Sequence, residues 1–194
     1  TISSGGADDE DADSLRERIR QAPEKFSNAG SRGAYRYHTL SAHQSITDVA
    51  ITSPSAGIVA IYLLTKDGNP TEEIIKIVQN YLSDDKIRPL TDCVKVYSSE
   101  KVDFEIKAKI YLYKDSDADS VMKTIKAKMK EYKISLSEKL GKDVIQTQII
   151  SILNSIYGVF KVVLETPITD IDILEYQWAN LQNWEISIGG YADE

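Results

Sequence analysis

The segment IRPLTDCVKVY, residues 87–97, holds the chain's only cysteine beside an arginine, a proline and an aspartate. A cysteine acts as a nucleophile when a neighbouring base removes its proton, so Cys93 is a candidate for covalent catalysis. Asp170 and Asp172, with Glu175 close by in the sequence, could act as paired catalytic carboxylates. One interpretation of the chain is therefore a hydrolase that uses Cys93 or the Asp170/Asp172 pair.

The sequence context of these residues argues against catalysis. Cys93 belongs to a run of strand-forming residues in which Val94 and Val96 share one face, and such a strand favours a buried or half-buried thiol. The two aspartates follow Pro167, as is typical of a turn, and no matching site stands out elsewhere. We therefore predict no catalytic residue and no enzyme, with the hydrolase kept as the alternative.

Other kinds of chemical site find little support in the sequence. His38 and His43 are five positions apart, which does not place them on one helix face as a pair of metal ligands. Residues 115–119 alternate aspartates like the start of a calcium loop, but Ser120 and Lys126 stand where that loop needs Gly and Glu. No glycine-rich phosphate loop and no G-x-S-x-G elbow is present. We expect no metal, no cofactor and no small-molecule substrate.

Length and composition are those of an ordinary globular protein. The 194 residues are 42% hydrophobic and 27% charged. No apolar run approaches the roughly 18–20 residues of a membrane span. A net charge of −7 argues against nucleic acid as a partner, because phosphate contacts need clustered Lys and Arg. The chain starts at Thr1 with a polar, acidic stretch unlike a signal peptide, so we expect a processed product or an excerpt of a longer chain.

Charge and tyrosine are unevenly distributed along the chain. Residues 101–142 hold seven acidic side chains and eleven lysines, whereas residues 160–194 hold seven acidic side chains and one basic one. Eleven tyrosines stand against three phenylalanines, and tyrosine suits protein interfaces because it joins a large apolar area to a polar tip. A solvated helix face is the simpler explanation of the lysines. We hypothesise that the lysine-rich segment faces an acidic neighbour.

The first 44 residues are predicted to be a flexible acidic lead-in followed by a helical segment. Asp13 or Ser14 looks like a helix cap, and Pro23 would end or kink the helix that follows. A second short helix is predicted over residues 34–43.

Residues 45–100 are predicted to form a β-β-α-β module. Strands are expected over 46–53 and 57–65, joined by a turn at 54–57, and the second of them is continuously apolar, as in a central strand covered on both faces. Thr71 caps a helix that extends to Leu82. Pro89 marks a boundary before the strand that begins at Cys93.

Residues 101–194 are predicted to form a second module. Residues 104–112 alternate so that five side chains point inward, namely Phe104, Ile106, Ala108, Ile110 and Leu112. A long helix then buries Val121, Ile125, Met129, Tyr132 and Leu136. A second helix is expected over 144–156, with strands over 159–167 and 184–190, while residues 169–182 are ambiguous between loop and helix.

The predicted fold class is α+β, with an N-terminal helical segment followed by two small α/β sandwich modules. The order β-α-α-β-β of the second module predicts a split-βαβ or ferredoxin-like arrangement with its helices on one face.

Several ordered motifs resemble one known family. They are SGGAD with the acidic stretch after it, residues 14–42, ITDVAITSPSAGIVAIYLLTKDGNP at residues 46–70, IRPLTDCVKV at residues 87–96, and the closing EISIGG. Together they resemble the baseplate J-like proteins of contractile-tailed bacteriophages, over nearly the whole chain. The signature positions that carry the resemblance are Arg36, Tyr37, Ser53, Pro54, Gly57, Asp67, Gly68, Arg88, Pro89, Leu90, Thr91 and Asp92.

The resemblance implies a structural role. It predicts a wedge component of a contractile tail baseplate, located in the virion tail and, during assembly, in the cytoplasm of the bacterial host. It implies other wedge proteins and further copies of the chain as partners, and no nucleic acid, membrane or small molecule. Members of this family carry a further N-terminal region, which the resemblance implies is missing here.

Overall fold

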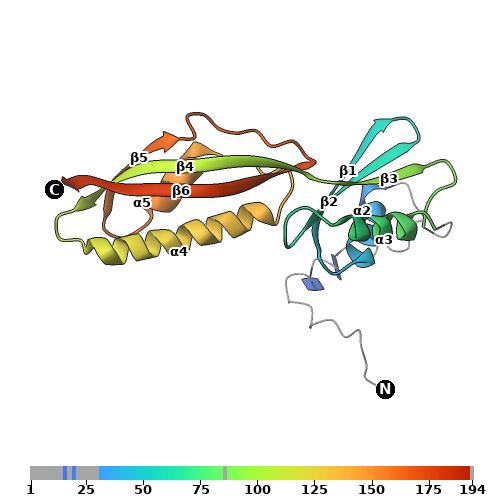
Figure 1. Cartoon of the computed structure of the whole chain (residues 1–194), viewed down its shortest axis with the longest axis horizontal. Helices are drawn as coiled ribbons and strands as arrows, with labels where there is room; N and C mark the ends of the chain where they lie inside the picture. Colours follow the sequence, from blue (N-terminus) through green and yellow to red (C-terminus); the bar gives the residue numbers. More distant parts are fainter. Residues whose placement is uncertain (1–14, 17–18, 21–30, 85–86, 193–194) are drawn as a thin grey trace, which may run out of the picture. The chain divides into compact units, whose positions relative to one another are not determined.

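The computed structural model describes residues 15–16, 19–20, 31–84 and 87–192. The chain divides between Ser99 and Glu100 into two compact units, each with its own three-stranded sheet and hydrophobic core (Figure 1). The predicted α+β class is confirmed. Of the first predicted helix, residues 15–16 and 19–20 are helical, and the remainder of that prediction, with the acidic lead-in, lies outside the described residues.

The first unit contains helix α2 (Arg32–Ala42), strands β1 (Ile46–Ser55) and β2 (Ile58–Thr65), helix α3 (Glu72–Leu82) and strand β3 (Cys93–Ser98). From β1 onward the elements follow the predicted order β-β-α-β. β2 is the central strand, antiparallel to β1 and parallel to β3. A parallel neighbour needs a crossover connection, and α3 supplies it.

Local sequence signals explain where the helices of the first unit begin. Ser31 and Thr71 are the N-caps of α2 and α3, and their hydroxyls accept hydrogen bonds from Ala34 N and Ile74 N. The core of this unit lies between the two helices and one face of the sheet, and it includes Tyr35, Ile61, Leu63, Val78, Leu82, Val94 and Val96.

The predicted burial of Cys93 is wrong. Val94 and Val96 are buried as expected, and Cys93 belongs to the opposite face of β3, where it is exposed. The alternation of the strand was predicted correctly, but both helices pack on the Val94 face. A strand that has a covered face on one side only leaves every second side chain in solvent.

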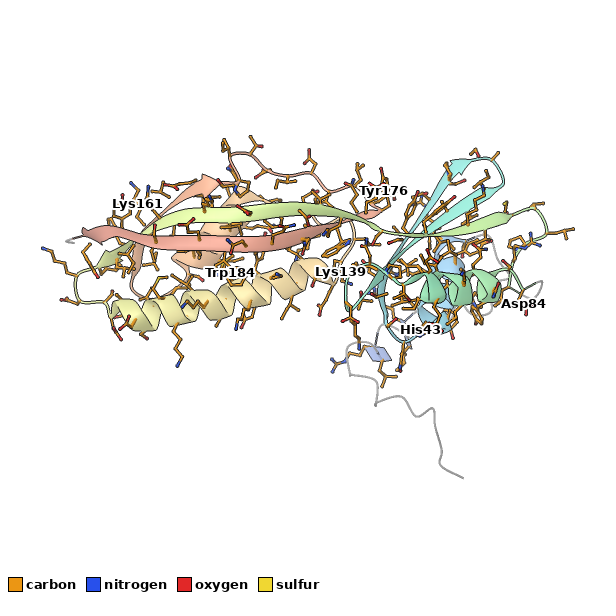
Figure 2. The ribbon with its side chains drawn as sticks, viewed as in Figure 1. His43, Asp84, Lys139, Lys161, Tyr176 and Trp184 are labelled. Carbon is orange, nitrogen blue, oxygen red and sulfur yellow. The ribbon has the colours of Figure 1, made fainter. Side chains whose placement is uncertain are left out.

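The second unit contains β4 (Glu100–Tyr113), α4 (Ala118–Ser137), α5 (Gln146–Asn154), β5 (Val159–Thr166) and β6 (Gln177–Ala192). β4 is central, and all five of its predicted inward side chains are buried: Phe104, Ile106, Ala108, Ile110 and Leu112. Asp117 caps α4, whose predicted inner face is also buried: Val121, Ile125, Met129, Tyr132 and Leu136. In Figure 2, Trp184 of β6 lies between that strand and α4, against the same core.

The predicted split-βαβ or ferredoxin-like topology is wrong. In a split βαβ unit another strand separates the two parallel strands, but here the strand order is β5-β4-β6 and the parallel strands β4 and β6 are direct neighbours. The reason is the length of β6, which pairs with β4 along its whole length, from Glu100 opposite Gln177 to Tyr113 opposite Ala192. No strand can enter between them.

The closing strand also begins earlier than predicted. Residues 177–182, expected to be loop or helix, form the first part of β6. A bulge places Leu181 opposite Phe104 and Asn183 opposite Glu105, so the inward side chains change parity at this point. That change of parity conceals the strand's alternation in the sequence. No described helix is long and apolar enough to cross a membrane.

Candidate functional site

Three of the predicted signature residues, Gly57, Arg88 and Pro89, lie around a fourth, Asp92. The Tyr35 hydroxyl donates a 2.8 Å hydrogen bond to Asp92 Oδ2, and Arg88 Nη1 donates one of 2.8 Å to the main-chain carbonyl of Asp92. Asp92 N donates to the carbonyl of Pro89 at 3.1 Å. Next along the chain, Cys93 N donates to Gly57 O at 2.7 Å. Helix α2, the β1–β2 turn and the loop before β3 are thus joined at one point.

The electrostatics of this junction favour a neutral phenol. Tyr35 is only 2% exposed. Burial, followed by the hydrogen bond and charge of Asp92, raises the pKa of the Tyr35 hydroxyl, while the charge of Arg88 acts in the opposite direction. At neutral pH Tyr35 is therefore a hydrogen-bond donor to a carboxylate, which stabilises the joint.

A shallow cavity of about 280 Å³ lies beside the Tyr35–Asp92 hydrogen bond. Its lining is Arg32, Tyr35, Ile51, Thr52, Ser53, Gly57, Ile58, Val59 and Asp92. The described residues contain no group of three or more His, Cys, Asp or Glu that could hold a metal ion. A guanidinium, a neutral phenol and a single carboxylate suit contact with a polar side chain better than bond-breaking chemistry.

A second polar junction ties α2 to the edge of the sheet. Arg36 Nη2 lies 2.6 Å from Oδ1 of Asp48, which is 6% exposed, and Arg36 Nη1 donates to Val49 O at 2.7 Å. The same Asp48 oxygen accepts from Val49 N at 3.0 Å. Both backbone groups of Val49 on edge strand β1 are therefore bonded by side chains.

The opposite edge of this sheet has a matching arrangement. The Gln79 carboxamide of α3 donates from Nε2 to Val94 O at 3.0 Å, and its Oε1 accepts from Val96 N at 2.9 Å. It bonds the edge of β3 as a neighbouring strand would. Sequence analysis did not identify Gln79 or Asp48, although a polar residue on the apolar face of a helix and a charge in an apolar strand were available signals.

The remaining signature residues hold turns or lie on the surface. Gly57 and Gly68 have φ of +74° and +93°, which favours glycine at both turns. Their neighbours Ser53, Pro54 and Asp67 are exposed, as is Thr91, and Leu90 is 94% exposed. Tyr37 packs edge-on against His38, with ring centroids 5.4 Å apart. Arg88, another signature residue, bonds the Asp92 carbonyl as described above.

The candidate hydrolase residues do not form a catalytic arrangement in the described part of the chain. No hydrogen bond or ion pair there joins Cys93 to a histidine. Asp170 Oδ1 accepts from Gln146 N at 2.8 Å, which serves the N-terminus of α5 and not a carboxylate pair. Asp172 is exposed and makes none of the hydrogen bonds described within the second unit.

Comparison with known proteins divides the chain into two consecutive domains, much as the fold divides it into two compact units. Residues 27–98 match the baseplate J-like central domain, and residues 104–187 match the baseplate J-like protein C-terminal domain. Baseplate protein J of Escherichia phage P2 is 41% identical over 75 residues, which is 38% of this chain and 25% of that protein.

A solved structure shares the fold. A chain in the six-fold symmetrised cryo-EM structure of the anti-feeding prophage baseplate matches with a TM-score of 0.62 at 11% identity, covering 88% of this chain and 41% of that one. The chain thus spans a quarter of the phage P2 relative and less than half of the structural one. Because consecutive domain models of one family account for residues 27–98 and 104–187, this chain belongs to the baseplate J-like protein family.

Proposed function

We propose that this chain is a structural wedge component of a contractile tail baseplate. The observation that carries the proposal is the match of both units, in order, to the central and C-terminal domains of the baseplate J-like family. The phage P2 relative bears the name of a baseplate protein, and the fold occurs in a prophage baseplate structure. The chain acts in the virion tail, after assembly in the bacterial cytoplasm.

The junctions in the first unit support a structural role. Their hydrogen bonds run between elements of the same unit, from Tyr35 to Asp92, from Arg36 to Asp48 and from Gln79 to β3. Such bonds fix the relative positions of helices and sheet, as a structural component requires. We propose that the signature residues Arg36, Arg88 and Asp92 maintain this geometry. We also propose that other wedge proteins and further copies of the chain are the partners.

We also propose three functional segments. Residues 1–44 are the lead-in and helical segment, whose Tyr35 and Arg36 enter the polar junctions. Residues 45–100 are the β-β-α-β module that supplies their partners, and residues 101–194 are a second module that offers exposed charged surfaces. No observation favours the hydrolase, so it is not proposed.

Co-purification tests the baseplate role. A tagged copy of the chain, expressed together with the tail genes that flank its own gene, should pull down other baseplate proteins. Loss of the gene should leave tails without complete baseplates in electron micrographs. Intact, contractile tails in the absence of the gene would contradict the proposal. So would a peptide or peptidoglycan hydrolase activity that disappears in Cys93→Ala.

A further inference from the structure

The middle of α4 carries a basic surface. Lys123, Lys126, Lys130 and Lys133 recur at i, i+3, i+7 and i+10, a spacing that places them along one side of a helix. The first three are exposed and the fourth is half-buried. Ile134 lies next to this row and is 56% exposed. We call these five residues the basic face.

The connection between β5 and β6 carries an acidic surface. Asp170, Asp172 and Glu175 are exposed there, beside Ile168, which is 84% exposed, and Leu174, which is 52% exposed. We call these five residues the acidic loop. Each of the two surfaces therefore places at least one exposed apolar side chain beside charges of a single sign, and surfaces of opposite sign are complementary in a protein contact.

The acidic loop is held in a defined conformation. Ile171 and Val144 exchange two backbone hydrogen bonds of 2.9 and 3.0 Å, and Ile173 N donates to Asp143 Oδ1 at 2.7 Å. Ile171 and Ile173 pack into or against the core, so the alternating residues Asp170, Asp172 and Leu174 point to solvent. A fixed loop loses little conformational entropy when it binds.

The two surfaces do not neutralise each other within one chain. Among the described residues, no ion pair joins a lysine of the basic face to a carboxylate of the acidic loop. In the view of Figure 1, strands β4 and β6 lie between α4 and most of the β5–β6 connection. Both surfaces are therefore available to another molecule at the same time.

We propose that the acidic loop of one copy docks on the basic face of a second copy, in a head-to-tail contact. Opposite charges and exposed apolar side chains on both surfaces favour this pairing. Two basic faces would instead repel each other, because they carry charge of the same sign. The contact is heterologous, so a row of copies keeps one free surface of each kind, at its two ends. The proposal rests on the proposed function, in which copies of the chain contact one another, and it names the surfaces.

Two paired variants make the test specific. Lys126→Glu/Lys130→Glu removes the basic face and leaves the Lys128–Glu131 ion pair in place. Asp172→Lys/Glu175→Lys removes the acidic loop and spares Asp170, which bonds the N-terminus of α5. A control, Lys66→Glu/Lys95→Glu, makes the same change in net charge as the first variant at exposed positions of the first unit. Thermal unfolding checks that all of them fold.

Sedimentation velocity over a concentration series then shows whether each protein is a monomer, a pair or a larger assembly. The unmodified chain and the control should associate at low ionic strength and dissociate as salt is added, because the Debye length falls from about 30 Å at 0.01 M to about 8 Å at 0.15 M. Each variant alone should stay monomeric. An equimolar mixture of the two variants should form pairs and nothing larger, because the first variant retains only an acidic loop and the second only a basic face.

Three results would overturn the proposed contact. The unmodified chain could stay monomeric at every concentration, both variants could still associate, or the mixture of the two variants could fail to pair. These outcomes leave the baseplate role intact, since co-purification with tail proteins tests that role separately. Conversely, head-to-tail association without co-purification supports the contact and contradicts the baseplate role.

Discussion

The hydroxyl of Tyr35 and the carboxylate of Asp92 are joined by a 2.8 Å hydrogen bond across 57 positions of sequence. Tyr35 comes from the buried side of α2, and Asp92 is the residue immediately before β3. The bond holds α2 against the start of β3, an outer strand of the three-stranded sheet. In IRPLTDCVKVY the side chain of the aspartate, and not that of the neighbouring cysteine, thus connects distant elements.

A double-mutant cycle measures this bond. Tyr35→Phe and Asp92→Ala should each lower the free energy of unfolding by roughly 1.5–3 kcal/mol, the usual range for hydrogen bonds to charged groups. The double variant should lose less than the sum, since the two residues share one interaction. Urea denaturation provides the values, and strictly additive losses would show that the bond contributes nothing.

Removal of Arg36 should be far more damaging than removal of an exposed lysine. Arg36→Ala leaves Asp48, whose side chain is 8% exposed, without its cation. Loss of one partner of a fully buried pair costs about 3–5 kcal/mol, and because Arg36 is 29% exposed the cost here should be about 2–3 kcal/mol. The matched control is Lys101→Ala, which removes an ion pair to Asp103 whose side chains are 44% and 39% exposed. That change should cost less than about 1 kcal/mol. Equal losses in denaturation experiments would refute the role of burial.

The Gln79 bonds to β3 should be measurable by hydrogen exchange. Gln79→Leu removes both, so the Val96 amide should exchange faster, and stability should fall by about 1–2 kcal/mol because buried backbone groups lose their partners. Asn80→Ala, on the exposed side of the same helix, is the control. Unchanged protection of Val96 in Gln79→Leu would show that the carboxamide is dispensable.

Tyr132 gives a prediction of opposite sign. It is 6% exposed and its hydroxyl has no hydrogen-bond partner in the described structure, so Tyr132→Phe should stabilise the protein by about 1 kcal/mol. Tyr113→Phe, at a residue that is 38% exposed, should change little. A loss of stability in Tyr132→Phe, measured by urea denaturation, would contradict the prediction.

The same residue makes stability depend on pH in the alkaline range. Burial raises the pKa of Tyr132 to about 12 from the ordinary 10.0, so the unfolded chain releases this proton first. Ionisation of the hydroxyl is therefore penalised in the folded chain, so stability is unaffected below pH 10 and falls as the pH rises towards 12. The unmodified chain should therefore lose stability more steeply than Tyr132→Phe over that range. Parallel curves from denaturation at several pH values would exclude the effect.

Sequence patterning predicted those elements whose burial follows a single regular period. β4 alternates without interruption where one face packs on the core, and α4 keeps its buried residues on one stripe, so both were predicted with their inward residues. β6 was only half predicted, because the bulge near Leu181 shifts its alternation. The sequence pattern could not show which strands pair with each other, since pairing joins segments far apart in the chain.

The candidate site shows the same limit. Signature positions such as Gly57 and Gly68 were identified through the family, and their positive φ gives a local reason for glycine. Tyr35, Asp48 and Gln79 form the contacts that matter, but each has its partner on another element. Local periodicity reports which face of a helix is apolar, and it does not report which distant carboxylate a tyrosine meets.

The side chains that bond the two outer strands of the first sheet have a consequence for selectivity. Main-chain hydrogen bonding is the same in all proteins, so an open strand edge accepts almost any extended segment. Arg36 and Asp48 bond the outward-facing main-chain groups of Val49 in β1. Gln79 bonds those of Val94 and Val96 in β3. Partners of this unit must then be distinguished by their side chains, which differ from protein to protein, and a particle with a fixed set of parts depends on that discrimination.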